Sequence, residues 1–283
     1  MRDTFYQAMT MFRQIRPIVL LFCMFFDPLS SSANIVILGD LTHDYRLKPG
    51  QTHEAVIELE NRDTAIRKVC VYQTDYTYLA NGESHFPAAG TSNRSNARWL
   101  TFSPKVVSIL PMQKSQIRYL VRAPKDSAKS GTYWSMLMVQ DVQKAVTEKT
   151  NSQESGDPSP APGFRYGVQI ITQIDDTGKI GLEFTSATVV SKNSKRLLVV
   201  DIENRGTRIA RPELWLEVYS SIGQKTGRFV TVPGTILPGC GIRREIDLSS
   251  LPKGSYNSLL IADCGKKDVF GLELKLVLGE DST

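Results

Sequence analysis

Hydrophobic and polar residues alternate with a period of two along much of this chain. In the run Thr52–Leu59, for example, Ala55 and Ile57 fall on one face while Glu54 and Glu58 fall on the other. Such alternation predicts β-strands that turn one face to a core. In the first part of the chain, strand-like runs are predicted at Asn34–Leu38, Thr52–Leu59, Ile66–Tyr78, Trp99–Phe102, Val106–Leu110, Ser115–Val121, Thr132–Val142 and Phe164–Ile174.

The second part of the chain continues in the same way, and no segment has a convincing helical period. Further strands are predicted at Leu182–Val190, Arg196–Glu203, Glu213–Tyr219, Arg228–Val232, Ile242–Leu248, Tyr256–Ala262 and Val269–Leu278. About seven short strands in roughly 100 residues are typical of an immunoglobulin-type β-sandwich. We therefore predict an all-β fold with two immunoglobulin-like β-sandwich domains in tandem.

A polar turn at Asp175–Lys179 separates the two sets of strands. It places a first domain at residues 34–177 and a second at residues 178–283. In both domains the tripeptide Glu-Asn-Arg follows an alternating strand, with its asparagine at Asn61 and at Asn204. This recurrence indicates a weak internal duplication of two similar sandwiches.

The N-terminus has the pattern of a targeting segment. Arg13 and Arg16 precede the apolar run Ile18–Phe26, and small residues follow as far as Ala33. This order is typical of a secretory signal peptide, which we place at residues 1–33. The alternative is a membrane anchor, but a spanning helix needs about 20 apolar residues, roughly twice this run. No other apolar stretch is long enough to cross a membrane, so the mature chain is expected to be exported.

Residues 143–163 are polar and carry several prolines. They contain too little apolar surface to order themselves, so we expect a flexible loop inside the first domain, with a domain linker as the alternative.

Composition narrows the range of functions. Hydrophobic residues make up 41% of the 283 residues and charged residues 22%, as in ordinary globular proteins. The net charge of +5 is not gathered into a basic stripe, so no nucleic-acid partner is expected. No motif for a nucleophile, a phosphate loop or a metal site occurs, and neither enzyme activity nor a cofactor is predicted. His43 lies between Asp40 and Asp44, which we interpret as a solvated turn rather than a metal site.

Three cysteines follow the predicted signal peptide: Cys70, Cys240 and Cys264. If the runs 242–248 and 256–262 pair as a hairpin, Cys240 and Cys264 lie at the same end of the second domain. A disulfide between them is then expected, and two reduced thiols are the alternative. Cys70 is left without a partner and is expected to be a buried thiol.

The segment Ser103–Pro111, continued by Gln113–Arg122 and by Ser130–Trp134, resembles the first domain of periplasmic pilus and fimbrial assembly chaperones, the PapD-like family. The resemblance is to a divergent member and covers residues of about 34–175. It implies a boomerang of two sandwiches in the periplasm. It also implies partners, namely fibre or surface-protein subunits and an outer-membrane usher. The chaperone caps such a subunit by lending it an edge β-strand until assembly at the outer membrane.

The counterpart of the lent strand is Phe164–Ile174. The predicted client-binding residues are Tyr166, Val168, Gln169, Ile170 and Ile171. The alternative is that the apolar face of this strand simply fills the core of its own domain. The alternative function is then a secreted structural or adhesive immunoglobulin-like binding module without a chaperone cycle.

The resemblance also implies basic residues that grip the carboxylate at the end of the client. In this sequence Tyr45 stands at the expected arginine position with Arg46 beside it, and Gln169 stands near the expected lysine. The cations that remain are Arg46 and Arg165, which we name as the possible carboxylate anchor. A monomer or a homodimer paired through strand edges is expected without a client.

Overall fold

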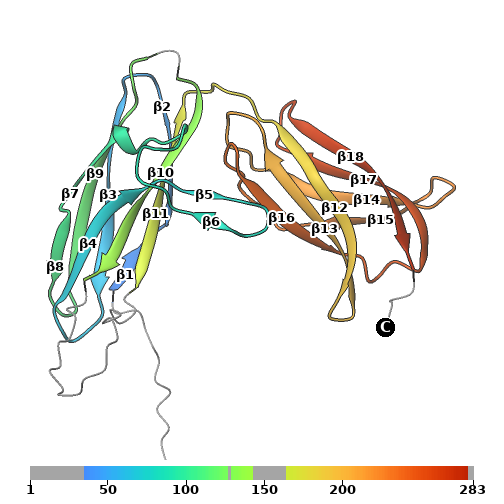
Figure 1. Ribbon diagram of the computed structural model, residues 1–283, viewed down its shortest axis with the longest axis horizontal. Helices are drawn as coiled ribbons and strands as arrows, with labels where there is room; N and C mark the ends of the chain where they lie inside the picture. The colour runs from blue at the N-terminus through green and yellow to red at the C-terminus, as the bar shows by residue number, and fades with distance from the viewer. Residues whose placement is uncertain (1–34, 127–128, 143–163, 280–283) are drawn as a thin grey trace, which may run out of the picture. The chain divides into compact units, whose positions relative to one another are not determined.

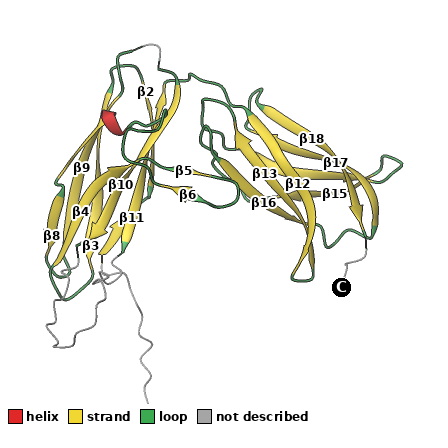
Figure 2. Ribbon diagram, in the orientation of Figure 1, coloured by secondary structure: helices red, strands yellow, loops and turns green. Residues whose placement is uncertain are grey.

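A computed structural model describes residues 35–126, 129–142 and 164–279 (Figure 1). The predicted signal peptide and the predicted loop 143–163 lie outside the described residues. The described chain is built almost entirely of strands and contains only one turn of 3-10 helix, Ala97–Trp99 (Figure 2). No helix in this part of the chain is long and apolar enough to span a membrane. The predicted all-β class is confirmed.

The first sandwich consists of two facing sheets and a small hairpin. One sheet has the strand order β1-β3-β9-β7 and the other the order β2-β11-β10-β4-β8, while β5 and β6 pair with each other. The strands are β1 (Ile35–Leu38), β2 (Thr42–Leu47), β3 (Thr52–Asn61), β4 (Arg67–Thr74), β5 (Thr77–Tyr78), β6 (Ser84–His85), β7 (Leu100–Ser103), β8 (Val106–Ile109), β9 (Lys114–Arg122), β10 (Gly131–Asp141) and β11 (Arg165–Ile174). Inward-facing residues of both sheets, such as Ile57, Ile117 and Leu137, form one buried cluster.

The second sandwich has the strand orders β12-β13-β16 and β15-β14-β17-β18 in its two sheets. Its strands are β12 (Leu182–Lys192), β13 (Lys195–Asn204), β14 (Glu213–Tyr219), β15 (Lys225–Val230), β16 (Gly241–Asp247), β17 (Gly254–Asp263) and β18 (Val269–Leu278). A separate buried cluster, which includes Leu198, Leu216 and Leu260, fills the space between these sheets. No named sheet combines strands of the two sets, so the tandem arrangement of two sandwiches is also confirmed.

The two Glu-Asn-Arg turns have the same internal structure. The Oδ1 of Asn61 accepts the N–H of Asp63 at 3.0 Å, and its Nδ2 donates to the carbonyls of Ala65 at 2.8 Å and Ile109 at 2.9 Å. Both asparagines are fully buried.

Asn204 repeats this arrangement in the second sandwich. It accepts from Gly206 N–H at 2.9 Å and donates to the carbonyls of Arg208 at 2.8 Å and Ile236 at 2.9 Å. Each asparagine therefore bonds residues two and four positions ahead and one residue in a distant part of the chain, so the recurrence seen in the sequence extends to side-chain hydrogen bonds.

The structure differs from the strand prediction at two places. Thr42–Leu47 forms β2, which the sequence reading missed because its residues, Thr-His-Asp-Tyr-Arg-Leu, carry no clear apolar face. The predicted long strand Ile66–Tyr78 is interrupted at Asp75, where β4 ends and the chain turns toward the β5–β6 hairpin.

The predicted disulfide is wrong for this structure, in which Cys70, Cys240 and Cys264 are free thiols. The prediction assumed that the strands after Cys240 and before Cys264 pair with each other. They are β16 and β17, and they belong to different sheets of the second sandwich. Cys240 is buried in a cluster with Trp134 and Leu237, whereas Cys264 packs against the core of the second sandwich.

Candidate functional site

The strand β11 is paired along only part of one side. On one side β10 pairs with it over its whole length, from Arg165 to Ile174. On the other side β2 runs parallel to it and pairs only with Gln169–Ile174 (Figure 1). Within the described residues, no strand pairs with residues 165–168 on this side, and we call this segment the free edge.

The backbone groups of Arg165 and Gly167 point away from β10. The N–H of Gln169 donates to the carbonyl of Leu41 at 2.8 Å, on the β2 side. The carbonyl of Phe164, by contrast, accepts from Asp141 on the β10 side. Because backbone groups alternate between the two sides of a strand, those of Arg165 and Gly167 point to the same side as Gln169. They offer unpaired donors and acceptors to an incoming strand.

Most side chains of the predicted client-binding residues are buried. Val168 and Ile170 are fully buried in the core of the first sandwich, and Tyr166 packs against that core. Ile171 faces the other side and is fully buried in the cluster with Trp134. Among the predicted side chains, only Gln169 and Tyr166 are half-buried. The alternative interpretation, in which this apolar face fills its own core, therefore agrees with the structure.

The other face of the free edge is formed by Arg165 and Gly167. A Cβ atom at Gly167 would lie 2.5 Å from the Cε of Met136 and 3.3 Å from the Sδ of Met138. Both methionines come from the neighbouring strand β10 and are buried. The missing side chain of Gly167 thus leaves room for the ends of two methionines beside the unpaired backbone.

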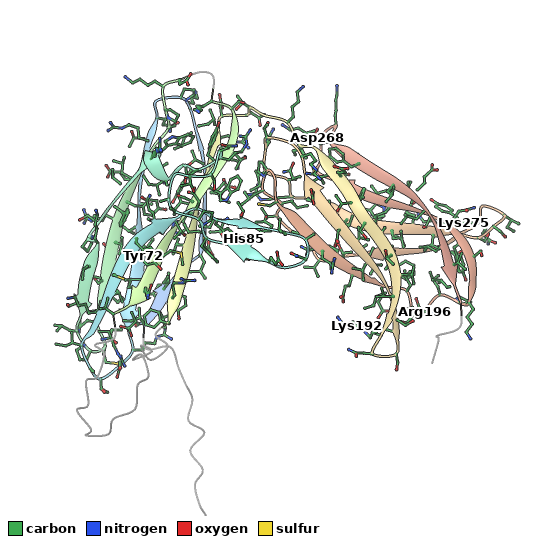
Figure 3. The ribbon with its side chains drawn as sticks, viewed as in Figure 1. Tyr72, His85, Lys192, Arg196, Asp268 and Lys275 are labelled. Carbon is green, nitrogen blue, oxygen red and sulfur yellow. The ribbon has the colours of Figure 1, made fainter. Side chains whose placement is uncertain are left out.

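The hairpin β5–β6 brings an aromatic residue to the same face. Phe86 follows β6, directly after His85, which is marked in Figure 3. The guanidinium of Arg165 lies 5.5 Å from the centre of the Phe86 ring, which is a cation–π contact. Phe86 is 41% exposed and so adds apolar surface beside the free edge.

The two cations named as the carboxylate anchor are not brought together. Arg46 pairs in register with Gln173, near the end of β11, whereas Arg165 stands at its start. Eight residues of strand separate these positions, which corresponds to about 26 Å. Arg46 and Arg165 therefore do not grip one carboxylate together.

Polar side chains on both faces of β2 hold this strand in place. The Tyr119 hydroxyl lies within hydrogen-bonding distance of His43 Nδ1 and is 2.6 Å from the Tyr45 hydroxyl. Burial raises the pKa of Tyr119, with a further contribution from Tyr45, so the phenol keeps its proton. On the other face, the carboxylate of Asp44 accepts a hydrogen bond from the side-chain amide of Gln173 at 2.9 Å and forms an ion pair with Arg211. These contacts fix the point at which β2 begins and the free edge ends.

The buried carboxylate of Asp75 organises the loop that follows the β5–β6 hairpin in the sequence. Asp75 is 1% exposed and accepts the N–H groups of Gly90, Thr91 and Ser92 at 2.7–3.1 Å. Burial acts to raise the pKa of Asp75, but these bonds and the Ser95 hydroxyl outweigh it, and the pKa lies below its ordinary value of 3.8.

We expect Asp75→Asn to lower the free energy of unfolding by about 2–3 kcal/mol at neutral pH. The NH₂ group of asparagine cannot accept the backbone N–H groups that the carboxylate now binds. A carboxyl with a lowered folded-state pKa contributes stability above its unfolded pKa, and loses it as the pH falls through the folded pKa. The difference between wild type and variant should therefore shrink below about pH 4. Urea unfolding followed at several pH values measures this, and a difference that is constant down to pH 2 would contradict it.

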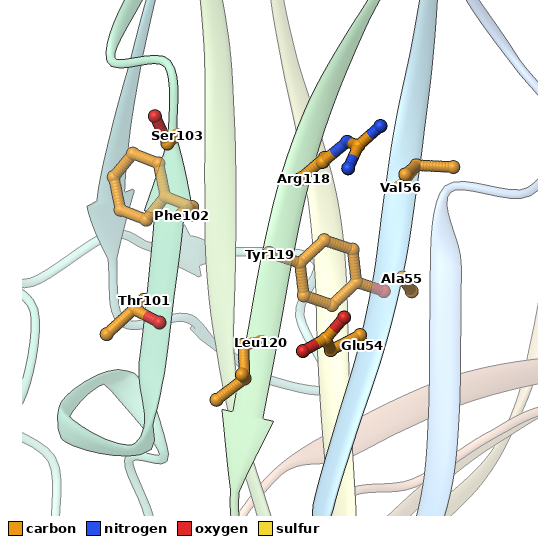
Figure 4. A pocket seen from close by; sticks show the side chains of 9 residues that line it. All are labelled: Glu54, Ala55, Val56, Thr101, Phe102, Ser103, Arg118, Tyr119 and Leu120. Carbon is orange, nitrogen blue, oxygen red and sulfur yellow. The ribbon is translucent and has the colours of Figure 1, made fainter.

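A hollow lies elsewhere, on the sheet that contains β3, β7 and β9. It has a volume of about 410 Å³ (Figure 4). Its lining residues are Glu54, Ala55, Val56, Thr101, Phe102, Ser103, Arg118, Tyr119 and Leu120. It contains no residue that the sequence named as a site. No group of three or more His, Cys, Asp or Glu side chains in the described ranges is arranged to hold a metal ion.

Comparison with known proteins gives structural matches only. No protein-family model matches the chain, and no curated protein does so at a significant level. Among solved structures, a chaperone–tip adhesin complex of CFA/I fimbriae is 14% identical, with a TM-score of 0.45, and the match covers 87% of this chain and 100% of that one. The class 5 fimbriae chaperone CfaA is also 14% identical, with coverages of 86% and 99% and a TM-score of 0.43.

A third match is the CsuC–CsuE chaperone–tip adhesion subunit complex of Acinetobacter baumannii. It is 12% identical, with coverages of 84% and 98% and a TM-score of 0.42. The architecture described above rests on the strand pairing of this chain itself.

Proposed function

We propose that this protein is a periplasmic chaperone that binds secreted pilin- or fimbrial-type subunits by strand addition at the free edge and caps them until assembly at the outer membrane. The observation that carries this proposal is that no strand of the described ranges pairs with residues 165–168 on the side of β11 away from β10. An incomplete β-subunit has its own open edge, which aggregates unless it is covered. Main-chain hydrogen bonds between the two edges would supply the affinity.

The proposed binding mode relies on the backbone more than on inserted side chains. Val168, Ile170 and Ile171 are buried, so a client would meet their backbone and not their side chains. The free edge offers the polar groups of Arg165 and Gly167, together with apolar surface from Phe86. An outer-membrane usher is the partner that such a cycle would require next.

The second candidate is a secreted structural or adhesive module without a chaperone cycle. It is favoured by the same burial, since a strand that fills its own core has fewer side chains to lend. In a homodimer, the free edge of a second copy would lie against the same surface. A chaperone, a module without a chaperone cycle and a homodimer therefore differ in what lies against Arg165.

A site-specific crosslink distinguishes these functions. The protein carries a photoreactive residue at position 165, or at position 228 on the second sandwich as the control, and is expressed with a C-terminal tag in its native host. We expect a stoichiometric adduct with a small secreted β-protein from position 165 only. An adduct with a second copy would favour the homodimer. A protein that yields no adduct from position 165 would overturn the chaperone proposal.

A further inference from the structure

Arg165 stands at the start of the free edge and is exposed. Its guanidinium contacts the ring of Phe86, and no acidic side chain among the described residues forms an ion pair with it. Other exposed arginines of the protein do pair with acids, as Arg205 does with Glu183 at 2.9 Å. Arg165 therefore retains an unsatisfied preference for a carboxylate, at the position where an added strand would place its own side chain.

Two residues further along, Gly167 presents a different surface. No side chain projects there, and the ends of Met136 and Met138 occupy the space. Methionine side chains are flexible and polarizable, and they adapt to apolar groups of varied shape. An apolar side chain of an added strand would lie beside these sulfur and methyl groups, because neighbouring strands are about 4.8 Å apart.

Arg165 and Gly167 point to the same face because side chains alternate along a strand. An added strand follows the same alternation, so the residues beside Arg165 and beside Gly167 are also two positions apart. We infer that the free edge selects extended segments in which an acidic residue and a large apolar residue are separated by one position. The inference rests on the proposed strand addition and names the segment that it would accept.

The spacing does not depend on strand direction. In a parallel arrangement the acidic residue precedes the apolar one, and in an antiparallel arrangement it follows. A palindromic segment, acid–x–apolar–x–acid, satisfies both cases and is therefore the best probe.

Short peptides test this selection directly. The probes are dye-labelled, C-terminally amidated peptides of alternating Thr and Val whose centre reads Glu-Thr-Leu-Thr-Glu, Lys-Thr-Leu-Thr-Lys or Glu-Thr-Ser-Thr-Glu. Fluorescence anisotropy measures binding to the wild type and to Arg165→Glu. Arg228→Glu is the matched control, because Arg228 also stacks on an aromatic ring, Trp215, but on the second sandwich.

We expect the wild type to prefer the Glu–Leu peptide over the Lys–Leu peptide by about tenfold, because opposite charges stabilise and like charges destabilise a cross-strand pair. Arg165→Glu should reverse this preference, and Arg228→Glu should leave it unchanged. The Glu–Ser peptide should bind the wild type about threefold or more weakly than the Glu–Leu peptide.

Equal binding of all three peptides would overturn the inference and leave strand addition standing. Binding of no peptide by a protein that still crosslinks its client from position 165 would also overturn the inference alone. If no peptide binds and no crosslink forms from position 165, both the inference and the proposed function fail.

Discussion

Gly167→Pro is expected to reduce client capture by roughly thirty- to a hundredfold while leaving the protein folded. The N–H of Gly167 points outward from the free edge, away from β10, so proline removes a donor that no described residue of the protein uses. Proline is tolerated on edge strands when its missing N–H faces outward. Its ring also projects toward the incoming strand, and so weakens the neighbouring bonds at Arg165.

Gly167→Ala is the matched control for this effect. It introduces the same Cβ atom near Met136, whose flexible end has to move in both variants, but it keeps the N–H group. We expect Gly167→Ala to capture the client within about threefold of the wild type. Capture is measured by co-purification from the envelope fraction, and unfolding in urea reports whether both variants are folded. Equal capture by a folded Gly167→Pro variant would show that the client does not use this edge.

Asn204→Ala is expected to lower the free energy of unfolding of the second sandwich by about 3–5 kcal/mol. The substitution removes three hydrogen bonds. The N–H of Gly206 and the carbonyl of Arg208 lose this partner, while the carbonyl of Ile236 keeps the N–H of Ala210 at 2.9 Å. Each unsatisfied buried polar group lowers the free energy of unfolding by about 1–3 kcal/mol, because its hydrogen bonds to water are lost on folding and not replaced.

Asn81→Ala provides the comparison for Asn204→Ala. Asn81 also accepts an N–H two residues ahead, from Glu83 at 3.0 Å, but it is exposed and water can replace it. Its substitution should cost less than about 1 kcal/mol. Urea transitions of the whole protein, followed by circular dichroism, measure both losses. A loss at Asn204 as small as the loss at Asn81 would show that the turn does not depend on the buried amide.

The sequence predicted the strands of this protein well where apolar and polar residues alternate. Each run of the second sandwich that it indicated is a strand, from β12 to β18, with ends shifted by a few residues. Prediction failed for β2, whose inward residues His43 and Tyr45 are polar and are satisfied by Tyr119, a partner more than 70 positions away. No local pattern contains that information.

The candidate site shows the same division. The sequence identified the strand 164–174 and its apolar face, but it could not decide whether that face serves the core or a client. The structure buries Val168 and Ile170 in the core of the first sandwich, and this burial depends on sheets that assemble from distant strands. Gly167, Phe86 and the limit set by β2 were also missed, because they matter only through neighbours brought together by folding.

The amino-acid sequence by itself determined the all-β class, the two sets of strands and the repeated Asn61 and Asn204 turns. These features follow from a period of two and from the bonds of each asparagine to residues two and four positions ahead, which are local properties of the chain. The tertiary structure alone decided which strands share a sheet, which excluded the hairpin assumed for Cys240 and Cys264. It alone also left residues 165–168, among the described residues, without a partner strand on the side away from β10, because pairing between strands depends on contacts between distant parts of the chain.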